Sequence, residues 1–188
     1  MKTFLKIIFL LIFICVCGIS PAAGQDGPGI VKITYVLHRL QTIASNQIAV
    51  WIEDGDGNYV KTLFATSFAA NGGFKKRAQT LPAWVKASDW ENASSSDIDA
   101  MSGATQPVGT REVVWDLTDI EGNHVRPGKY VYKIEGNIFW DNRVLWQGSI
   151  YVGGEENISI AEATYFPENT TENRVLVEQV QAIYEPSR

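Results

Sequence analysis

Alternation of apolar and polar residues runs through much of the chain and predicts many short β-strands. Residues 31–37, 48–52 and 130–134 carry apolar side chains at every second position, which is typical of half-buried strands. The same pattern, bounded by Gly, Pro, Asn or Asp, recurs in residues 60–64, 111–116, 144–152 and 175–184. About eight strands with turns between them predict an all-β fold, an antiparallel β-sandwich of the immunoglobulin-like kind.

The apolar positions of these strands also predict the core of the sandwich. Buried aromatic side chains dominate the energetics of protein cores, so tryptophans in alternating strands are expected to face inward. The expected core contains Ile33, Val50, Trp51, Trp115, Tyr132, Ile134 and Trp146.

A weak internal repeat marks two turns. Residues 54–61 and 119–126 share the pattern D-x-x-G-N-x-V-[K/R]. Asp and Asn tolerate left-handed backbone and Gly supplies positive φ, so both copies are predicted to be hairpin tips. A calcium loop is the alternative for the first copy, but Tyr59 and Ala65 stand where an EF-hand needs glycine and a bidentate glutamate.

One segment, residues 68–108, departs from the strand pattern. It contains a predicted short helix from Pro82 to Trp90, with the proline in the first turn, followed by a polar stretch over residues 92–96. An insertion of about 40 residues is far longer than an ordinary hairpin connection, and loops of such length in compact domains are usually functional or disordered. We therefore look for the chemistry of the protein here.

The N-terminus has the composition of a secretory signal peptide. Lys2 and Lys6 precede an apolar run over residues 7–16, and small residues follow it up to Gly24. We expect residues 1–24 to be removed, leaving residues 25–188 as a single exported domain, periplasmic or extracellular, with no direct membrane insertion after processing. Both cysteines, Cys15 and Cys17, lie in the removed part, which would exclude disulfides, iron–sulfur clusters and thiolate catalysis in the mature chain.

Charge narrows the range of partners. The chain has 16 basic and 21 acidic residues and a net charge of −5, and loss of Lys2 and Lys6 makes it more negative. Binding to nucleic acid or anionic lipid is therefore not expected. The basic cluster of Lys75, Lys76 and Arg77 could meet an acidic group or simply be solvated. With two histidines in all, a three-histidine zinc site is impossible.

The insertion contains the sequence D-x-x-S-G-A-T, from Asp99 through Ser102, Gly103 and Ala104 to Thr105. This sequence resembles the flavinylation motif of subunits of sodium-pumping and Rnf-type redox complexes, in which an exported flavin transferase joins FMN through its phosphate to the last threonine. The resemblance implies a phosphoester-linked FMN on Thr105, with no assigned role for Asp99. Small residues before the threonine are consistent with this, because they let the backbone approach a phosphate closely. A turn that closes a loop before a strand is the alternative interpretation.

Two tryptophans of the insertion, Trp84 and Trp90, are candidates for contact with the flavin ring because aromatic faces offer a stacking surface. Packing in the core is the alternative for both. A metal site is not expected.

A second resemblance covers most of the chain. The segments 49–54, 81–84, 99–105 and 114–116, together with Gly122 and residues 126–130, are similar to a predicted periplasmic family whose members accompany PepSY-type membrane proteins and flavin transferases. Residues 115–130 also resemble the immunoglobulin-like domain of flagellar hook-capping proteins. The first resemblance implies a flavin transferase and a membrane-bound PepSY-type or haem redox protein as partners.

These observations lead to one expected function and one alternative. The expected function is that of an exported electron carrier with covalent FMN, in which the cofactor supplies the redox chemistry and the protein is not itself an enzyme. The alternative is a non-redox immunoglobulin-like binding or structural module of the cell envelope, whose insertion contacts a partner through Trp84 and Trp90.

Overall fold

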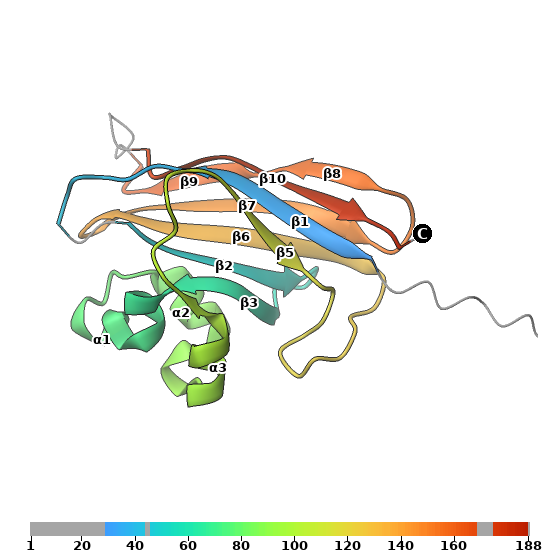
Figure 1. Cartoon of the computed structure of the whole chain (residues 1–188), viewed down its shortest axis with the longest axis horizontal. Coiled ribbons are helices and arrows are strands. Elements are labelled where there is room, and N and C mark those ends of the chain that lie inside the picture. Colours follow the sequence, from blue (N-terminus) through green and yellow to red (C-terminus); the bar gives the residue numbers. More distant parts are fainter. Residues whose placement is uncertain (1–28, 44–45, 169–174, 188) are drawn as a thin grey trace, which may run out of the picture.

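The computed structural model describes residues 29–43, 46–168 and 175–187. Two β-sheets, one of four strands and one of six, face each other, and short helices cover part of the larger sheet (Figure 1). The predicted fold class, an all-β sandwich with a helix-containing insertion, is confirmed. The proposed signal peptide lies outside the described residues.

The four-stranded sheet has the order β5-β1-β10-β8. All of its pairings are antiparallel. Its strands are β5 (Gly109–Trp115), β1 (Ile30–Leu37), β10 (Val177–Glu185) and β8 (Asn157–Ile160).

The six-stranded sheet has the order β4-β3-β2-β6-β7-β9. Its pairings are antiparallel except for the short parallel contact between β3 and β4. Its strands are β4 (Ser102–Gly103), β3 (Tyr59–Thr66), β2 (Gln47–Asp54), β6 (Gly128–Phe139), β7 (Asn142–Val152) and β9 (Glu162–Phe166).

The main core lies between the two sheets. The alternate residues of β1 that the sequence predicted to share a face are all buried there, because successive side chains of a strand point to opposite faces. Trp115 packs edge-on against Tyr130 at 5.0 Å between ring centroids, and its indole N–H donates to the carbonyl of Thr118. The core prediction is confirmed for Ile33, Val50, Trp115, Tyr132 and Ile134.

Two predicted core tryptophans differ from the prediction, one in the face that it occupies and one in its degree of burial. Trp51 is buried, but on the opposite face of β2, where it packs beneath the insertion. It points there because Val50 and Ile52, its neighbours in the strand, take the inter-sheet face. Trp146 is only partly buried and packs at the margin of the main core, with its indole N–H donating to the carbonyl of Val177.

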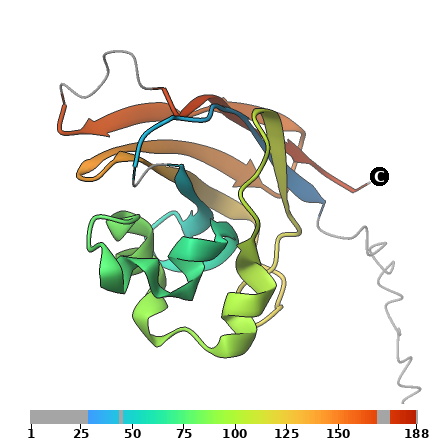
Figure 2. The same cartoon turned by 60° about the vertical axis from the view of Figure 1, so that its left-hand side comes forward.

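The insertion contains more helix than the sequence predicted. The predicted helix over residues 82–90 is observed as α2 (Pro82–Ser88) followed by a 3-10 turn (Trp90–Asn92). The remaining pieces are a bent helical turn (Ala69–Gly73), α1 (Phe74–Lys76) and α3 (Ser95–Met101). Figure 2 shows these pieces packed on the outer face of the six-stranded sheet, away from the other sheet.

The first copy of the repeated turn is the tip of the β2–β3 hairpin, as predicted. The second forms the same kind of turn, flanked by a single bridge between Thr118 and His124, in the connection from β5 to β6, which lie in different sheets. Asp54 Oδ1 accepts hydrogen bonds from the backbone N–H groups of Asp56 and Asn58. Asp119 Oδ1 accepts from Glu121 and Asn123 in the same way. The repeat is therefore explained by two identical aspartate-closed turns, and no group of three or more metal-ligating side chains occurs among the described residues.

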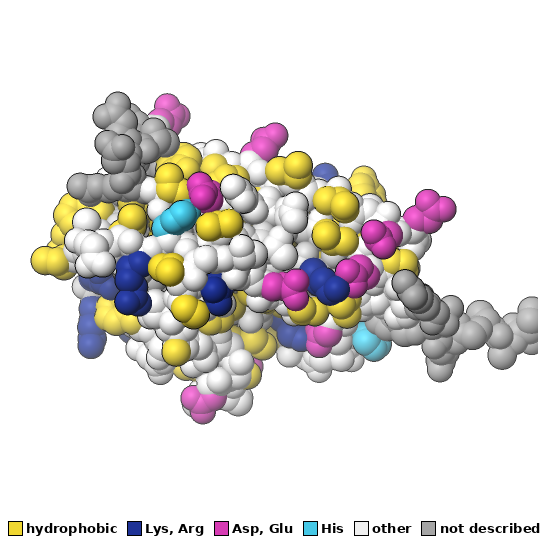
Figure 3. Space-filling view, turned by 45° about the horizontal axis from the view of Figure 1, so that its top comes forward, with side chains coloured by type: hydrophobic (Ala, Val, Ile, Leu, Met, Phe, Trp, Pro, Cys, Tyr) yellow, Lys and Arg dark blue, Asp and Glu magenta, His cyan; other side chains and the backbone are white. Residues whose placement is uncertain are grey.

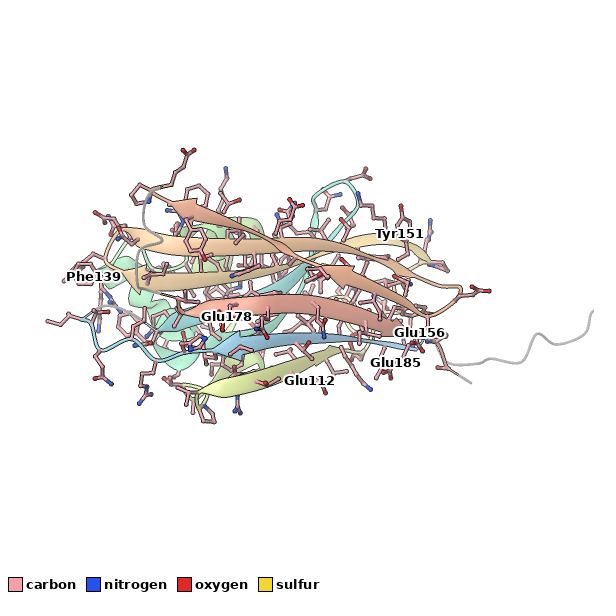
Figure 4. All side chains as sticks on the ribbon, turned by 90° about the horizontal axis from the view of Figure 1, so that it is seen from above. Glu112, Phe139, Tyr151, Glu156, Glu178 and Glu185 are labelled. Atoms are coloured by element: carbon pink, nitrogen blue, oxygen red, sulfur yellow. The ribbon has the colours of Figure 1, made fainter. Side chains whose placement is uncertain are left out.

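The segment between the predicted strands over residues 144–152 and 175–184 contributes β8 and β9. Ile158 and Ile160 of β8 are exposed, so their alternation does not mark a buried face. Figures 3 and 4 show the outer face of the four-stranded sheet, where scattered apolar side chains lie among acidic ones, including Glu112, Glu178 and Glu185.

Within the described part of the chain, no helix is both long and apolar enough to cross a membrane.

Candidate functional site

The D-x-x-S-G-A-T sequence lies where the chain leaves the insertion and crosses from one sheet to the other. It begins in α3, passes through β4 at the edge of the six-stranded sheet, and continues as an extended segment to β5 of the four-stranded sheet. In Figures 1 and 2 this crossing segment runs along the side of the sandwich. The motif is thus held by a different element at each end.

The polar stretch before the motif starts α3. Ser94 accepts a hydrogen bond from the backbone N–H of Asp97, and the Asp97 carboxylate accepts one from the backbone N–H of Ser94. This reciprocal arrangement is a capping box, which satisfies N–H groups that the first helical turn leaves unpaired. Asp99 is exposed two residues further along the helix. The structure therefore gives Asp97 a structural role and leaves the Asp99 carboxylate in solvent.

The middle of the motif is fixed by close packing against β3. Ser102 pairs with Ala65, and Gly103 pairs with Thr66. A Cβ atom on Gly103 would lie 2.4 Å from the ring of Phe64, which is closer than real carbon contacts allow. Glycine at this position therefore has a packing reason, independent of any approach by a phosphate.

The end of the motif is exposed. Ala104 and Thr105 are solvent-accessible, and among the described residues the Thr105 hydroxyl has no hydrogen-bond partner. The next residue is anchored, because the hydroxyl of buried Tyr35 donates to Gln106 Oε1 at 2.6 Å. Burial raises the pKa of Tyr35, so the hydroxyl remains a donor at ordinary pH. Further on, the Arg111 guanidinium donates to the carbonyl of Val108 at 2.9 Å.

A hollow of about 440 Å³ lies beside Thr105. Its lining residues are Arg39, Thr105, Gln106, Pro107 and Val108. The pairing of β1 with β5 brings these segments together. Leu37 lies opposite Gly109 at the end of this pairing, so the residues after Leu37 and those before Gly109 both border the hollow. The site thus offers the exposed hydroxyl of Thr105, the exposed guanidinium of Arg39 and a small apolar surface formed by Pro107 and Val108.

The two tryptophans of the insertion are not part of this hollow. Trp84 is fully buried and Trp90 is 3% exposed, and their rings pack at 4.7 Å between centroids. The indole N–H of Trp84 donates to Thr62 Oγ1, and that of Trp90 donates to the carbonyl of Ala70. Both indoles are therefore core side chains that hold the insertion to the sheet, and neither presents a ring face to solvent.

A buried carboxylate lies under the same helix. Glu135 Oε2 accepts a hydrogen bond from the backbone N–H of Trp84 at 2.9 Å, and Oε1 accepts one from Ala83 at 3.3 Å. These are N–H groups of the first turn of α2, so Glu135 closes the start of that helix from the neighbouring sheet. The Arg143 Nε atom lies 3.1 Å from Oε1 but is not aligned for a hydrogen bond.

Burial controls the protonation of this carboxylate. Desolvation raises the pKa of Glu135 to about 7, against the two N–H donors and the Arg143 charge, which lower it. Glu135 lies in the seam, by which we mean the buried contact between the insertion and the six-stranded sheet, and it is far in sequence from the motif. We assign it a structural role.

The basic cluster takes no part in the hollow. The Arg77 guanidinium lies 4.4 Å from the centroid of the Phe68 ring, and Lys75 lies 5.8 Å from that of Phe74. The cation beside Thr105 is instead Arg39, which the sequence analysis did not single out. The signal for it was weak, because only the pairing of β1 with β5 shows that the residues after β1 meet those after the motif.

Comparison with known proteins identifies a family. The model of a family described as "Predicted periplasmic protein (DUF2271)" matches residues 31–166. These residues include the six-stranded sheet, the insertion and the whole D-x-x-S-G-A-T sequence, and they end before β10 of the four-stranded sheet. No curated protein matches, and no solved structure matches.

Proposed function

Because the chain belongs to the DUF2271 family of predicted periplasmic proteins, we propose that it works outside the cytoplasm as an electron carrier with FMN attached covalently to Thr105. The protein supplies attachment and orientation, and FMN when bound supplies the electron-transfer chemistry. In this proposal the protein accepts and donates electrons without converting a substrate of its own.

The observation that supports the proposal most strongly is the exposure of Thr105 between two anchored neighbours. Gly103 is packed against Phe64, and Gln106 is bonded to Tyr35, while the hydroxyl between them faces solvent. A modifying enzyme must reach an acceptor hydroxyl, and a fixed backbone on both sides lowers the entropic cost of presenting it. In a turn closed by a threonine side chain the hydroxyl bonds to the local backbone, and the Thr105 hydroxyl makes no such bond among the described residues.

The remaining residues of the motif fit a phosphate ester. Ser102 and Gly103 are half-buried in β4, whereas Thr105 is exposed. Of the two hydroxyl residues in the motif, Thr105 is therefore the better acceptor of FMN. The hollow beside it provides room for part of the cofactor, and Arg39 provides a positive charge for the phosphate. Asp99, exposed on α3, is available to a partner enzyme.

Attachment would be a phosphoryl transfer with no redox change. Thr105 Oγ1 forms a bond to the FMN phosphorus of FAD, the pyrophosphate bond breaks, and AMP leaves. The hydroxyl proton passes to a base of the transferase or to water. The product carries the mass of FMN less one water. The protein itself contributes the nucleophilic oxygen and its accessibility.

The partners follow from the same proposal. An exported flavin transferase would load the cofactor, and a membrane-bound PepSY-type or haem protein would exchange electrons with it. The resemblance of the sequence to proteins that accompany such partners supports this assignment. A nucleic-acid partner is not proposed, given the net charge of −5.

The test is co-expression with an exported flavin transferase, followed by mass spectrometry of the tryptic peptide that contains Thr105. We expect FMN on the peptide of the wild type, none on Thr105→Ala, and unchanged loading on Ser102→Ala. Flavin on Ser102 would correct the site and keep the function. An unmodified wild-type peptide, with a known substrate of the transferase loaded in parallel, would contradict the proposal and favour a non-redox module of the cell envelope.

A further inference from the structure

We propose that Arg39 binds the phosphodiester that joins FMN to Thr105. This inference rests on the proposed function, because it concerns the group attached there. It adds a residue outside the motif and from a distant part of the chain to the cofactor site.

The position of Arg39 is set by strand pairing. Leu37 and Gly109 are the last pair of the β1–β5 ladder, so the residues after β1 run beside those before β5. Arg39 and Thr105 consequently line one hollow. The side of the hollow that carries Thr105 is held in place by the Tyr35–Gln106 hydrogen bond.

Arg39 differs from the neighbouring basic side chains, His38 and Arg111, in having no partner among the described residues. His38 Nε2 lies 2.8 Å from Glu178 Oε1. The Arg111 guanidinium donates to the carbonyl of Val108. The Arg39 side chain is exposed and makes no ion pair or hydrogen bond within the described ranges. Its charge is therefore available to an anion in the hollow.

The chemistry of the two groups is complementary. A guanidinium is charged at all ordinary pH values, and its planar fork can donate two parallel hydrogen bonds to two phosphate oxygens. A phosphodiester on Thr105 Oγ1 carries one negative charge and two such oxygens, and it is tethered at the wall of the hollow that Arg39 also lines. Tethering removes the entropic cost of bringing the two partners together.

The apolar part of the hollow explains why the arginine matters. Val108 is 57% exposed, and Pro107 beside it is also exposed. These two side chains can pack against an aromatic ring, but they offer it no hydrogen bonds from their side chains. The phosphate is thus the part of the cofactor that this chain can fix by charge. Arg39 acts as a positioning residue, which limits the motion of the tethered group.

The test uses the flavin-loaded protein and two readouts, the ³¹P resonance of the phosphodiester and the time-resolved anisotropy of flavin fluorescence. In Arg39→Gln we expect a shifted and narrower phosphorus resonance and a larger fast component in the anisotropy decay. Arg39→Lys, which keeps the charge but loses the fork, should lie in between. Arg126→Gln removes an exposed arginine from the connection before β6, outside the hollow, and is the matched control.

The outcomes separate the two proposals. Protein without phosphorus on Thr105 contradicts the proposed function. Loaded protein in which Arg39→Gln and Arg126→Gln give the same spectrum and the same decay as the wild type overturns the role of Arg39 alone. Reduced loading of Arg39→Gln, with normal spectra in the loaded fraction, would overturn it too and would place Arg39 in recognition by the transferase.

Discussion

The protein has two buried regions that are built differently. The core between the sheets consists of aliphatic and aromatic side chains from strands of both sheets, including the long hairpin of β6 and β7. The region between the six-stranded sheet and the insertion is smaller, and its tryptophans come with buried polar partners. Thr62 and Glu135 contact α2, and Glu53 accepts from the Trp51 indole N–H.

The two regions are therefore stabilised in different ways. Burial of apolar area is non-directional and sums over many contacts, so the sandwich depends on volume and pattern. The insertion depends on a few directional bonds, each of which costs free energy if its partner is removed while the other group stays buried. The insertion should therefore respond to single polar substitutions and to pH, and the sandwich to loss of volume. Thr105 lies at the junction between the two regions.

The largest effect is expected from a cavity in the inter-sheet core. Trp115 is fully buried and packs on Tyr130. Trp115→Ala should lower the free energy of unfolding by about 3–5 kcal/mol, the usual cost of deleting a large aromatic side chain from a core. Denaturant unfolding followed by circular dichroism measures it. A cost under about 1 kcal/mol would mean that the sandwich does not depend on this core.

The second effect tests the seam beneath the insertion through pH. The pKa of Glu135 is about 7 in the folded protein against an ordinary 4.5, so the folded state binds the proton more tightly than the unfolded state. The resulting stability is fully present below pH 4.5 and is lost as the pH rises to about 7. From the size of the shift, the loss is about 3 kcal/mol.

Glu135→Gln is the control for this prediction. The amide oxygen can still accept a hydrogen bond from α2, but the side chain no longer titrates, so the change in stability between pH 4.5 and pH 7 should shrink. Denaturant unfolding at a series of pH values gives both curves. If wild type and variant fall in parallel, the pH dependence comes from other groups and the seam is not pH-sensitive.

The extent to which the sequence predicts this molecule follows the same division. Alternation predicted the strands that enclose the main core, because their apolar side chains point into the core and their polar side chains point outward, as in β1. It failed for β8, where Ile158 and Ile160 face solvent. It also failed for α3, in which no residue is fully buried and Ile98 and Met101 are only partly buried against the insertion core. The capping pair Ser94 and Asp97 marks the start of this helix.

The candidate site was predictable only in part. The motif could be read because its residues are contiguous, and its place in a long insertion was visible from the break in alternation. Arg39 could not be read, since its nearness to Thr105 depends on which strands pair. Trp84 and Trp90 carried no sign of their burial, because a helix that packs on a sheet and one that offers aromatic rings to a ligand can share the same composition.

A third and smaller effect concerns the turn that closes the β2–β3 hairpin. Asp54 accepts hydrogen bonds from two backbone N–H groups and from the side-chain amide of Asn58. Asp54→Ala should lower stability by about 1 kcal/mol, the net value of a typical lost hydrogen bond, and Asp54→Asn should retain most of it. Thermal unfolding of the two variants measures the difference. Equal losses would show that the amide oxygen of asparagine cannot replace the carboxylate, and no loss in either variant would show that the side-chain acceptor does not matter.

The smallest effect on stability is expected at the junction itself. The Thr105 hydroxyl is exposed and contacts no polar group among the described residues, so Thr105→Ala should change the free energy of unfolding by less than about 0.5 kcal/mol. The same substitution should remove covalent flavin completely. Unfolding curves and flavin absorbance of one preparation test both statements together. A stable variant without flavin separates the function of Thr105 from the two buried regions around it, whereas a variant destabilised as much as Asp54→Ala would show that the hydroxyl serves the fold.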